Sequence, residues 1–415
     1  MTLILAGANN KSAYFRGHRA GRAEARQPPG TYVALSGGGQ AFVPAPLPPK
    51  LEWTPDLVAA ATEATHLLGR LSGHGVGVPN PHLLIRPFVR REAVLSSRIE
   101  GTQATLGELL ADEAGAAVDR APDDLKEVRN YVVALEKGVS LLKQLPLSLR
   151  LVKKLHRILM KGVRGDSAAP GDFRRAQNWI GPRGATPQNA RFVPPPPNEV
   201  PRCLDAWERY MHQRDLPPVL QAALLHYQFE AIHPFIDGNG RVGRLMIVLF
   251  LIERQVLPSP LLYLSAFFEA SRADYYDLLT GVTERDDWRS WIFYFLSGVS
   301  EQAQDALKRV EKIQALREKW RQRLASRQTK TVMALVDRLT ANPFITIGGA
   351  AEELGMAFTT AQRQIDWLVK HRIVALRDDA KRGRVYVAQA LLDILDEPAA
   401  RTQFKETNEK KRKRR

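Results

Sequence analysis

Cysteine and long apolar runs are both scarce in this sequence. Among 415 residues there is a single cysteine, Cys203, which excludes a disulfide framework and favours a reducing compartment such as the cytoplasm. No uninterrupted apolar run is long enough to span a bilayer. Residues 1–7 lack the basic and apolar regions of a signal peptide. We therefore expect a cytoplasmic protein that does not use a membrane as a partner.

Acidic side chains are also in short supply. Asp and Glu number 44 against 60 Lys and Arg, which gives a formal net charge of +16 and favours an acidic partner, with nucleic acid as the first candidate. Part of this excess is local, because residues 410–415 are all basic and a tail of this kind is typically solvated. The 44% hydrophobic and 25% charged fractions are typical of a globular protein of two or three domains.

One stretch, residues 233–244 (His-Pro-Phe-Ile-Asp-Gly-Asn-Gly-Arg-Val-Gly-Arg), combines groups that suit phosphate chemistry. It lies between two apolar runs with helical character, about Val219–Ile232 and Leu245–Glu253. Gly238 and Gly240 allow positive φ angles, so that successive backbone N–H groups can converge on an anion. A helix beginning near Gly240 would add its free N–H groups and the positive end of its dipole.

Charged side chains complete the pattern in this loop. Arg241 and Arg244 carry guanidinium groups suited to phosphate oxygens. Asp237 is placed to hold a Mg²⁺ that bridges phosphates. His233 precedes the loop and can take up a proton near neutral pH. Each residue alone is more often structural, but together they predict a phosphate-binding loop with a base beside it.

The stretch resembles the signature of the Fic family, H-P-F-x-D-G-N-G-R-x-G-R, with every fixed position filled. The resemblance implies transfer of AMP from ATP to a Tyr, Ser or Thr hydroxyl of a target protein or of the enzyme itself. It makes His233 the base and Asp237 the Mg²⁺ ligand, and gives Arg244 the γ-phosphate. The expected ATP-binding residues of the loop are Gly238, Asn239, Gly240, Arg241, Val242, Gly243 and Arg244. Gly240 argues against the related Doc kinases, which have lysine there.

A second motif lies upstream. A helix is predicted from about Pro87 to Ile99, followed by a stop at Gly101, and Thr105 with Glu108 predicts a capping box for the next helix. Glu100 then faces the negative end of a helix dipole, which is unfavourable unless a cation is near. Ser96-Ser97-Arg98-Ile99-Glu100-Gly101 resembles the inhibitory motif of Fic proteins, [S/T]-x-x-x-E-[G/N]. The resemblance implies that Glu100 pairs with Arg244 and blocks productive binding of ATP.

Two further segments follow the same resemblance. Residues 178–181 and 190–194 are short extended candidates that could pair as a hairpin. In Fic proteins the corresponding flap holds the target backbone by strand addition. The expected flap contacts are Ile180, Gly181, Phe192 and Val193. Later in the chain the resemblance implies adenine and ribose contacts by Tyr275, Tyr276 and Trp288, although aromatic residues at helical spacing usually belong to a core.

Near the C-terminus the order helix, helix, helix, hairpin resembles a winged helix-turn-helix domain. Gln362, Arg363, Gln364 and Lys370 would lie on or near its exposed recognition face and contact DNA, or the domain would bind a protein instead.

The fold prediction is therefore mainly α, with a Fic-type helical core, a β-hairpin flap and a small C-terminal winged-helix domain. The expected divisions are a flexible arm (1–50), an N-terminal helical region (51–120), the catalytic core (121–300), a connector helix (301–328), the winged-helix domain (329–395) and a basic tail (396–415).

Two alternatives stay open at this point. The loop would look the same in an enzyme that transfers another phosphate-linked group, such as phosphocholine or UMP, because only the base pocket would differ. The chain could also be a DNA-binding regulator in which the Fic unit senses ATP.

Overall fold

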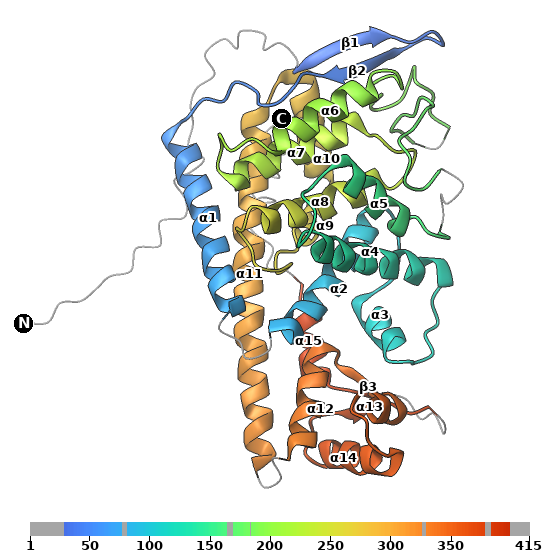
Figure 1. The fold of residues 1–415 in the computed structure, drawn as a ribbon, viewed down its shortest axis with the longest axis vertical. Helices are drawn as coiled ribbons and strands as arrows, with labels where there is room; N and C mark the ends of the chain where they lie inside the picture. The colour runs from blue at the N-terminus through green and yellow to red at the C-terminus, as the bar shows by residue number, and fades with distance from the viewer. Residues whose placement is uncertain are drawn as a thin grey trace, which may run out of the picture.

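The computed structural model describes residues 29–76, 81–163, 169–182, 184–325, 329–377 and 383–398. The expectations for residues 1–28 and for the tail from residue 399 lie outside these ranges. Within them the chain is mainly helical, as predicted (Figure 1). The first helices are α1 (Pro55–Val76), α2 (Pro81–Ile99), α3 (Leu106–Glu113), α4 (Pro122–Leu141), α5 (Leu149–Leu159), α6 (Val200–Met211), α7 (Pro218–Ile232) and α8 (Asn239–Glu253). They are followed by α9 (Ser265–Ala270), α10 (Arg272–Arg285) and α11 (Trp288–Arg323). None of the described helices is both long and apolar enough to cross a membrane.

Helices α7 and α8 form the centre of the molecule. Nearly all their residues are buried, which agrees with sequences that are apolar on every face. They pack against each other, and α4, α5, α6 and α11 surround them. The loop between them, residues 233–238, carries the predicted phosphate-binding stretch. This arrangement places a short polar loop at the end of a rigid, buried helix pair.

The prediction of a flexible arm over residues 1–50 is wrong for residues 30–44. These residues form an antiparallel hairpin of β1 (Gly30–Ala34) and β2 (Gln40–Pro44), paired from Gly30 with Pro44 to Ala34 with Gln40. Ala41, Phe42 and Val43 are buried. Two glycines make the turn of this hairpin, with φ of 86° at Gly38 and 87° at Gly39.

Two predicted boundaries also differ. Helix α2 begins at Pro81, not near Pro87, so that Pro87 lies inside the helix. A proline there removes one backbone hydrogen bond, and burial of Leu84, Phe88 and Val89 on either side offsets the loss. Helix α11 runs without a break through the predicted boundary at residue 300, so the core and the expected connector share one helix.

The C-terminal module begins at α12 (Lys330–Ala341) and continues through β3 (Phe344–Thr346), α13 (Ile347–Glu353), α14 (Phe358–Lys370), β4 (Ala375–Leu376), β5 (Val385–Val387) and α15 (Gln389–Asp396). The predicted helices and strands are present. Strand β3, which pairs with β5, and helix α15 were missed. Gln364 is buried, so it does not belong to the exposed face of α14, whereas Gln362, Arg363 and Lys370 are exposed. The assignment as a winged-helix domain stays a prediction.

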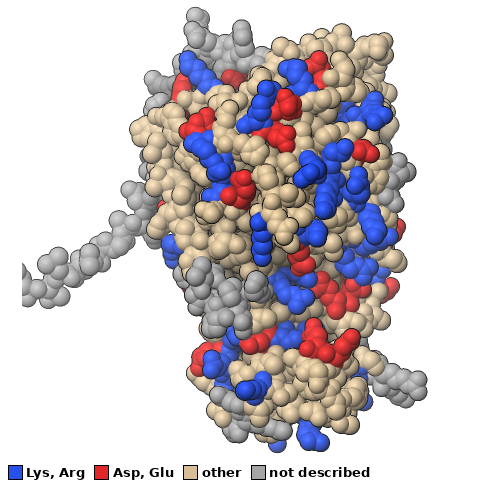
Figure 2. All heavy atoms as spheres, viewed as in Figure 1, with Lys and Arg blue, Asp and Glu red and all other residues tan. Residues whose placement is uncertain are grey.

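The positive charge of the chain is not evenly spread. Figure 2 shows basic side chains gathered over α5 and the adjacent part of α4. Arg150, Lys154 and Arg157 are exposed on α5, which has no acidic residue. This surface lies beside the polar loop, because α5 packs against α8.

Candidate active site

The loop between α7 and α8 is held in two left-handed turns. His233 ends α7 with φ of 50° and ψ of 59°, and its N–H donates to the carbonyl of Phe229 at 2.9 Å. Gly238 precedes α8 with φ of 79°, and a Cβ there would lie 2.8 Å from Sδ of Met160. Only glycine fits this position without strain. The first N–H groups of α8, which have no acceptor inside the helix, therefore face the loop.

Asn239 fixes the shape of the loop. Its side chain is buried, with Oδ1 accepting from the N–H of Phe235 and Nδ2 donating to the carbonyl of Phe235, both at 2.8 Å. Both ends of the amide are therefore used inside the protein. The Asn239 side chain is therefore not free to bind phosphate in this conformation, and only its backbone N–H could do so.

His156, on α5, supports the same loop and was missed in the sequence. Its Nδ1 accepts from the N–H of Gly171 at 2.8 Å, and Nε2 lies 3.0 Å from the carbonyl of Asp237. Because Nδ1 accepts, Nε2 carries the proton and donates. The ring stacks on Phe235 with centroids 3.7 Å apart. Burial lowers the pKa of His156 to about 4, so the ring is neutral. In sequence it is a histidine on the buried face of an amphipathic helix, which does not distinguish it from a core residue.

His233 is buried at the end of α7, and its surroundings favour the neutral form of its ring. Burial, and then the nearby charge of Arg174, lower the pKa of His233 to about 4. The ring is therefore neutral at pH 7 and able to accept a proton. The buried guanidinium of Arg174 donates to the carbonyl of His233 at 2.9 Å and to that of Pro195 at 2.5 Å. Arg174 thus ties the backbone of the base to the segment that follows the flap.

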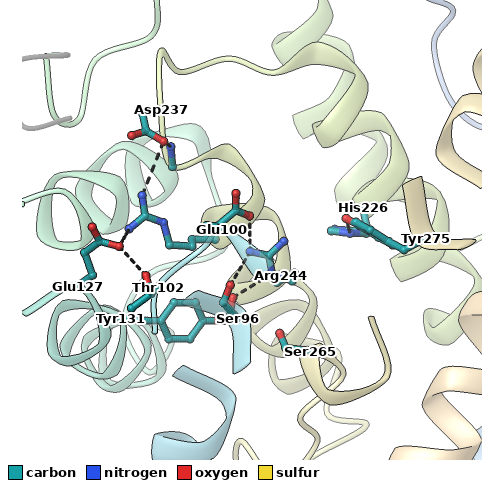
Figure 3. Close-up of polar contacts among 12 residues, drawn as sticks. Ser96, Glu100, Thr102, Glu127, Tyr131, His226, Asp237, Arg244, Ser265 and Tyr275 are labelled. Atoms are coloured by element: carbon teal, nitrogen blue, oxygen red, sulfur yellow. Dashed lines mark hydrogen bonds and ion pairs between the residues drawn. The ribbon is translucent and has the colours of Figure 1, made fainter. Parts of the chain in front are cut away.

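Arg241 points into the protein. Its side chain is 4% exposed and contacts Glu127 of α4 at 3.4 Å and Asp237 at 3.7 Å. Thr102 donates to the same carboxylate oxygen of Glu127 at 2.8 Å, as Figure 3 shows. The expectation that the Arg241 side chain binds phosphate is therefore wrong in this conformation. Arg241 instead joins the loop to α4 and to the segment after α2.

Val242 and Gly243 do not face the loop either. Val242 is fully buried in the core, and its N–H is bonded to the carbonyl of Gly238 at 3.0 Å. A Cβ at Gly243 would lie 2.6 Å from Oε1 of Glu230 and 3.3 Å from the ring of His226. Gly243 therefore allows α7 and α8 to approach closely. The prediction of phosphate contacts by these two residues is corrected to a packing role.

Arg244 and Glu100 form the predicted ion pair. Nη2 of Arg244 lies 2.6 Å from Oε1 of Glu100, with the Arg244 side chain 2% exposed and that of Glu100 33% exposed (Figure 3). Ser96 supports the pair, because Arg244 donates to its Oγ at 2.9 Å and to its carbonyl at 3.0 Å. Burial alone would raise the pKa of Glu100, but the charge of Arg244, its hydrogen bond to Glu100 and the charge of Arg241 together lower that pKa below its usual value.

The Glu100 carboxylate also lies at the start of α8. A Cβ at Gly240 would be 2.3 Å from Oε1 of Glu100 and 2.9 Å from Nη1 of Arg244. The carboxylate therefore sits against the first turn of the helix, where free N–H groups and the dipole attract an anion. A negatively charged group of the chain itself occupies the predicted phosphate site.

The flap is a narrow hairpin beside this site. Ile180 and Phe192 form one antiparallel bridge, with N–H to carbonyl distances of 2.8 and 3.1 Å. Val193 is buried, and its carbonyl accepts from the N–H of Phe42 in β2 at 2.8 Å. Gly181 is exposed near the tip. The strand containing Phe192 and Val193 is therefore covered on one side by β2, which the sequence did not predict.

The expected adenine contacts divide into core and surface. Tyr275 and Trp288 are 1% and 5% exposed, and the Tyr275 hydroxyl lies 2.9 Å from Nε2 of His226, so both belong to the core. The expectation of adenine stacking on them is wrong in this conformation. Tyr276 is only partly buried, and Arg191 of the flap lies over its ring at 5.6 Å. Of the three residues, Tyr276 remains available to a ligand.

Asp237 offers one carboxylate at the rim of the loop. Its side chain is half exposed, and Oδ1 accepts from the N–H of Gly238 at 2.5 Å. No cluster of three or more potential metal ligands occurs among the residues that the structure describes. A single carboxylate fits Mg²⁺, which is commonly held by one or two carboxylates together with phosphates and water. It does not fit a metal that needs a full set of protein ligands.

Comparisons with known proteins find relatives of parts of this chain. Residues 146–251 match the Fic/DOC family, and residues 58–140 match the Fic/DOC family N-terminal region. Over 155 residues the chain is 34% identical to "Protein adenylyltransferase Fic" of Drosophila yakuba and 32% identical to the protein of the same name in Drosophila melanogaster. These matches cover 36% of this chain and 29% of each relative, so the chain spans less than a third of the length of those proteins.

The fold has a counterpart among solved structures. A Fic family protein from Desulfovibrio desulfuricans G20 superposes with a TM-score of 0.55 at 20% identity. The match covers 82% of this chain and 98% of that one. It establishes similarity of fold over most of the chain.

Proposed function

Because the chain belongs to the Fic/DOC family, we propose that it is a protein adenylyltransferase. It transfers AMP from ATP to a Tyr, Ser or Thr hydroxyl of a target protein or of itself. The observation that carries this proposal is the Glu100 carboxylate at the start of α8, bound to Arg244. A site that holds one anion by a helix N-terminus and a buried arginine suits the phosphates of a nucleotide.

In the proposed reaction His233 removes the proton of the target hydroxyl. The hydroxyl oxygen attacks the α-phosphorus, the bond from that phosphorus to the oxygen bridging to the β-phosphate breaks, and pyrophosphate leaves with the bonding electron pair. The N–H groups of Gly240 and its neighbours stabilise the charge on the phosphates, and Arg244 binds the γ-phosphate. Mg²⁺ bound by Asp237 and the phosphates would neutralise charge on the leaving pyrophosphate. Most of the rate enhancement then comes from position and charge.

Glu100 is the proposed inhibitor. While it pairs with Arg244, the guanidinium is not available to the γ-phosphate and the start of α8 carries a competing negative charge. ATP then binds without the alignment that in-line attack requires. Departure of Glu100 leaves Arg244 oriented by Ser96, ready for the phosphate.

The target is proposed to add a strand to the flap. The side of the flap that contains Val193 is covered by β2. The opposite edge, residues 178–181, is partly exposed and is the edge left for a target backbone. Asn178 anchors this edge to the catalytic loop by donating to the carbonyl of Phe235 at 2.9 Å.

The proposed location is the cytoplasm, and the buried free thiol of Cys203 agrees with it.

A second candidate function rests on α14. Gln362, Arg363 and Lys370 are exposed on this helix, whose other face is packed in the module. These residues can contact DNA or an acidic protein. If the chain is a DNA-binding regulator that senses ATP, His233→Ala leaves its biological effect intact, whereas Arg363→Glu abolishes it.

The test compares nucleotide donors on the activated variant. Glu100→Gly protein is incubated with ATP, UTP or CDP-choline, and the group added to the protein is identified from the mass increase by intact-protein mass spectrometry. We expect addition of AMP from ATP and none by Glu100→Gly,His233→Ala. Transfer of UMP or phosphocholine in preference to AMP would replace the proposal with the alternative donor.

A further inference from the structure

The C-terminal end of α15 is bound by two buried arginines, one from α2 and one from α11. Arg309 of α11, which is 1% exposed, donates to the carbonyls of Ile394 and Glu397, the latter at 2.6 Å. Arg91 of α2, which is 7% exposed, donates to the same carbonyl of Glu397 at 3.2 Å. The free carbonyls and negative dipole end of a helix suit this contact.

Asp305 of α11 organises the two arginines. It accepts from Arg309 at 2.7 Å and lies 3.7 Å from Arg91. Asp305 is shared by two guanidinium groups, and the end of α15 supplies further partners, the carbonyl of Glu397 and the negative charge of Asp396. Burial lowers the pKa of Arg91, which agrees with a charge that depends on these few acceptors. Removing α15 would leave Arg91 and Arg309 underpaired.

A second contact joins the module to the segment after the inhibitory motif. Asn342, which ends α12, donates to the carbonyl of Leu110 in α3 at 2.9 Å. Helix α12 packs along α2, and α15 packs against both α2 and α3 (Figure 1). Leu391 and Leu395 of α15 are buried in the same core as Leu110. The module therefore packs directly on α2 and contributes to its position.

Helix α2 connects this contact to the active site. It carries Arg91 in its middle and Ser96 in its last turn, and Glu100 follows directly after its end. A helix is stiff over this length of about two turns, so a shift of its middle moves its end. We propose that the C-terminal module is the regulatory domain of the catalytic site, and that its docking on α2 through α12 and α15 keeps Glu100 on Arg244. This inference rests on the proposed adenylyltransferase function.

The test loosens the contact at two independent points in the full-length protein. Arg309→Gln removes the bonds to the end of α15, and Asn342→Ala removes the bond to Leu110. Arg289→Gln is the control for loss of an arginine from helix α11, because Arg289 is half exposed and pairs with Asp56 of α1. Each variant is measured for self-labelling with ATP and for hydrogen exchange of the amides of residues 92–99 without ATP.

We expect both docking variants to exchange faster in residues 92–99 and to label themselves about threefold to tenfold more than wild type, with the control unchanged. In a Glu100→Gly background the same changes should add nothing, because the residue they act through is gone. An equal increase in that background, or unchanged exchange and labelling in both variants, would overturn the inference. Faster exchange without any labelling, even in Glu100→Gly, would support the coupling of the module to α2 and refute the proposed enzyme function.

Discussion

Replacing Glu100 with glycine removes the anion that occupies the predicted phosphate site. The change should leave the fold intact, because Arg244 keeps its bonds to Oγ and to the carbonyl of Ser96. It also removes the group that lies against Gly240 at the start of α8. ATP then meets an oriented, unpaired guanidinium and the free N–H groups of the helix.

The size of the effect follows from the burial of the pair. A hydrogen bond to a charged group contributes about 1.5–3 kcal/mol when buried, whereas an exposed ion pair contributes about 0.2–1 kcal/mol. Arg244 is buried but a third of the Glu100 side chain is exposed, so we take about 1.5 kcal/mol. That value corresponds to roughly a tenfold increase in the fraction of Arg244 available to the γ-phosphate. Glu100→Asp should activate less, since the shorter side chain still reaches part of the way.

The assay is the initial rate of self-labelling with saturating ATP, with thermal unfolding measured in parallel. Gln103→Gly is the control, because it introduces the same flexible residue into the same segment at an exposed position, where the side chain donates to the carbonyl of Gly101. Adding Arg244→Ala to Glu100→Gly should silence the enzyme. If Glu100→Gly is no more active than Gln103→Gly at saturating ATP, the proposed inhibition by Glu100 is wrong, although the enzyme assignment would survive.

Three further predictions concern the base, the metal and the C-terminal module. The pKa of His233 is lowered to about 4, so its neutral form persists well below the usual 6.5. Glu100 is one of the charges that raise this pKa, so its removal lowers the pKa further, and kcat/KM of Glu100→Gly should stay level down to about pH 5. A fall centred near pH 6.5 would contradict the buried environment of His233. Asp237→Ala should weaken ATP binding in the presence of Mg²⁺ but not in its absence, as measured by calorimetry, and equal affinities of wild type with and without Mg²⁺ would exclude the metal role. If α14 binds DNA, affinity should fall steeply with added salt and Arg363→Glu should lower it at every sequence tested, whereas an unchanged affinity would move the contact elsewhere.

The sequence alone predicted features that depend on residues close together in the chain or on strongly apolar runs. The unfavourable position of Glu100 at the end of α2 predicts a nearby cation, and the structure supplies Arg244. The capping box of Thr105 and Glu108 is present, because both of its residues lie within one turn. The helical runs around the loop are also recovered, since their apolar residues must be buried whatever the neighbours are.

The sequence was not sufficient where a distant partner decides the outcome. Arg241 and Arg244 look alike in the signature, yet Arg241 turns inward because Glu127 of α4 lies beneath it. Tyr275 and Trp288 have the spacing of either a ligand platform or a core, and packing against His226 and Tyr227 selects the core.

The N-terminal hairpin and α15 were missed for a similar reason. The hairpin was predicted as part of a flexible arm, but it is bonded to the flap strand at Val193, far along the chain. Helix α15 is short, and its position depends on two arginines from other helices. Contacts of this kind have no local signature, since the residues that stabilise them come from distant parts of the sequence.

The most direct test of the proposed function measures which phosphorus atom of ATP, α or γ, is transferred to protein. Glu100→Gly protein is incubated separately with ATP labelled at the α-phosphorus and at the γ-phosphorus, and with each label the His233→Ala double variant is run beside it. The proposal predicts protein labelling from the α-position only, with loss of about 10²–10⁴-fold in the double variant. Labelling from the γ-position, or equal α-labelling with and without His233, would contradict it.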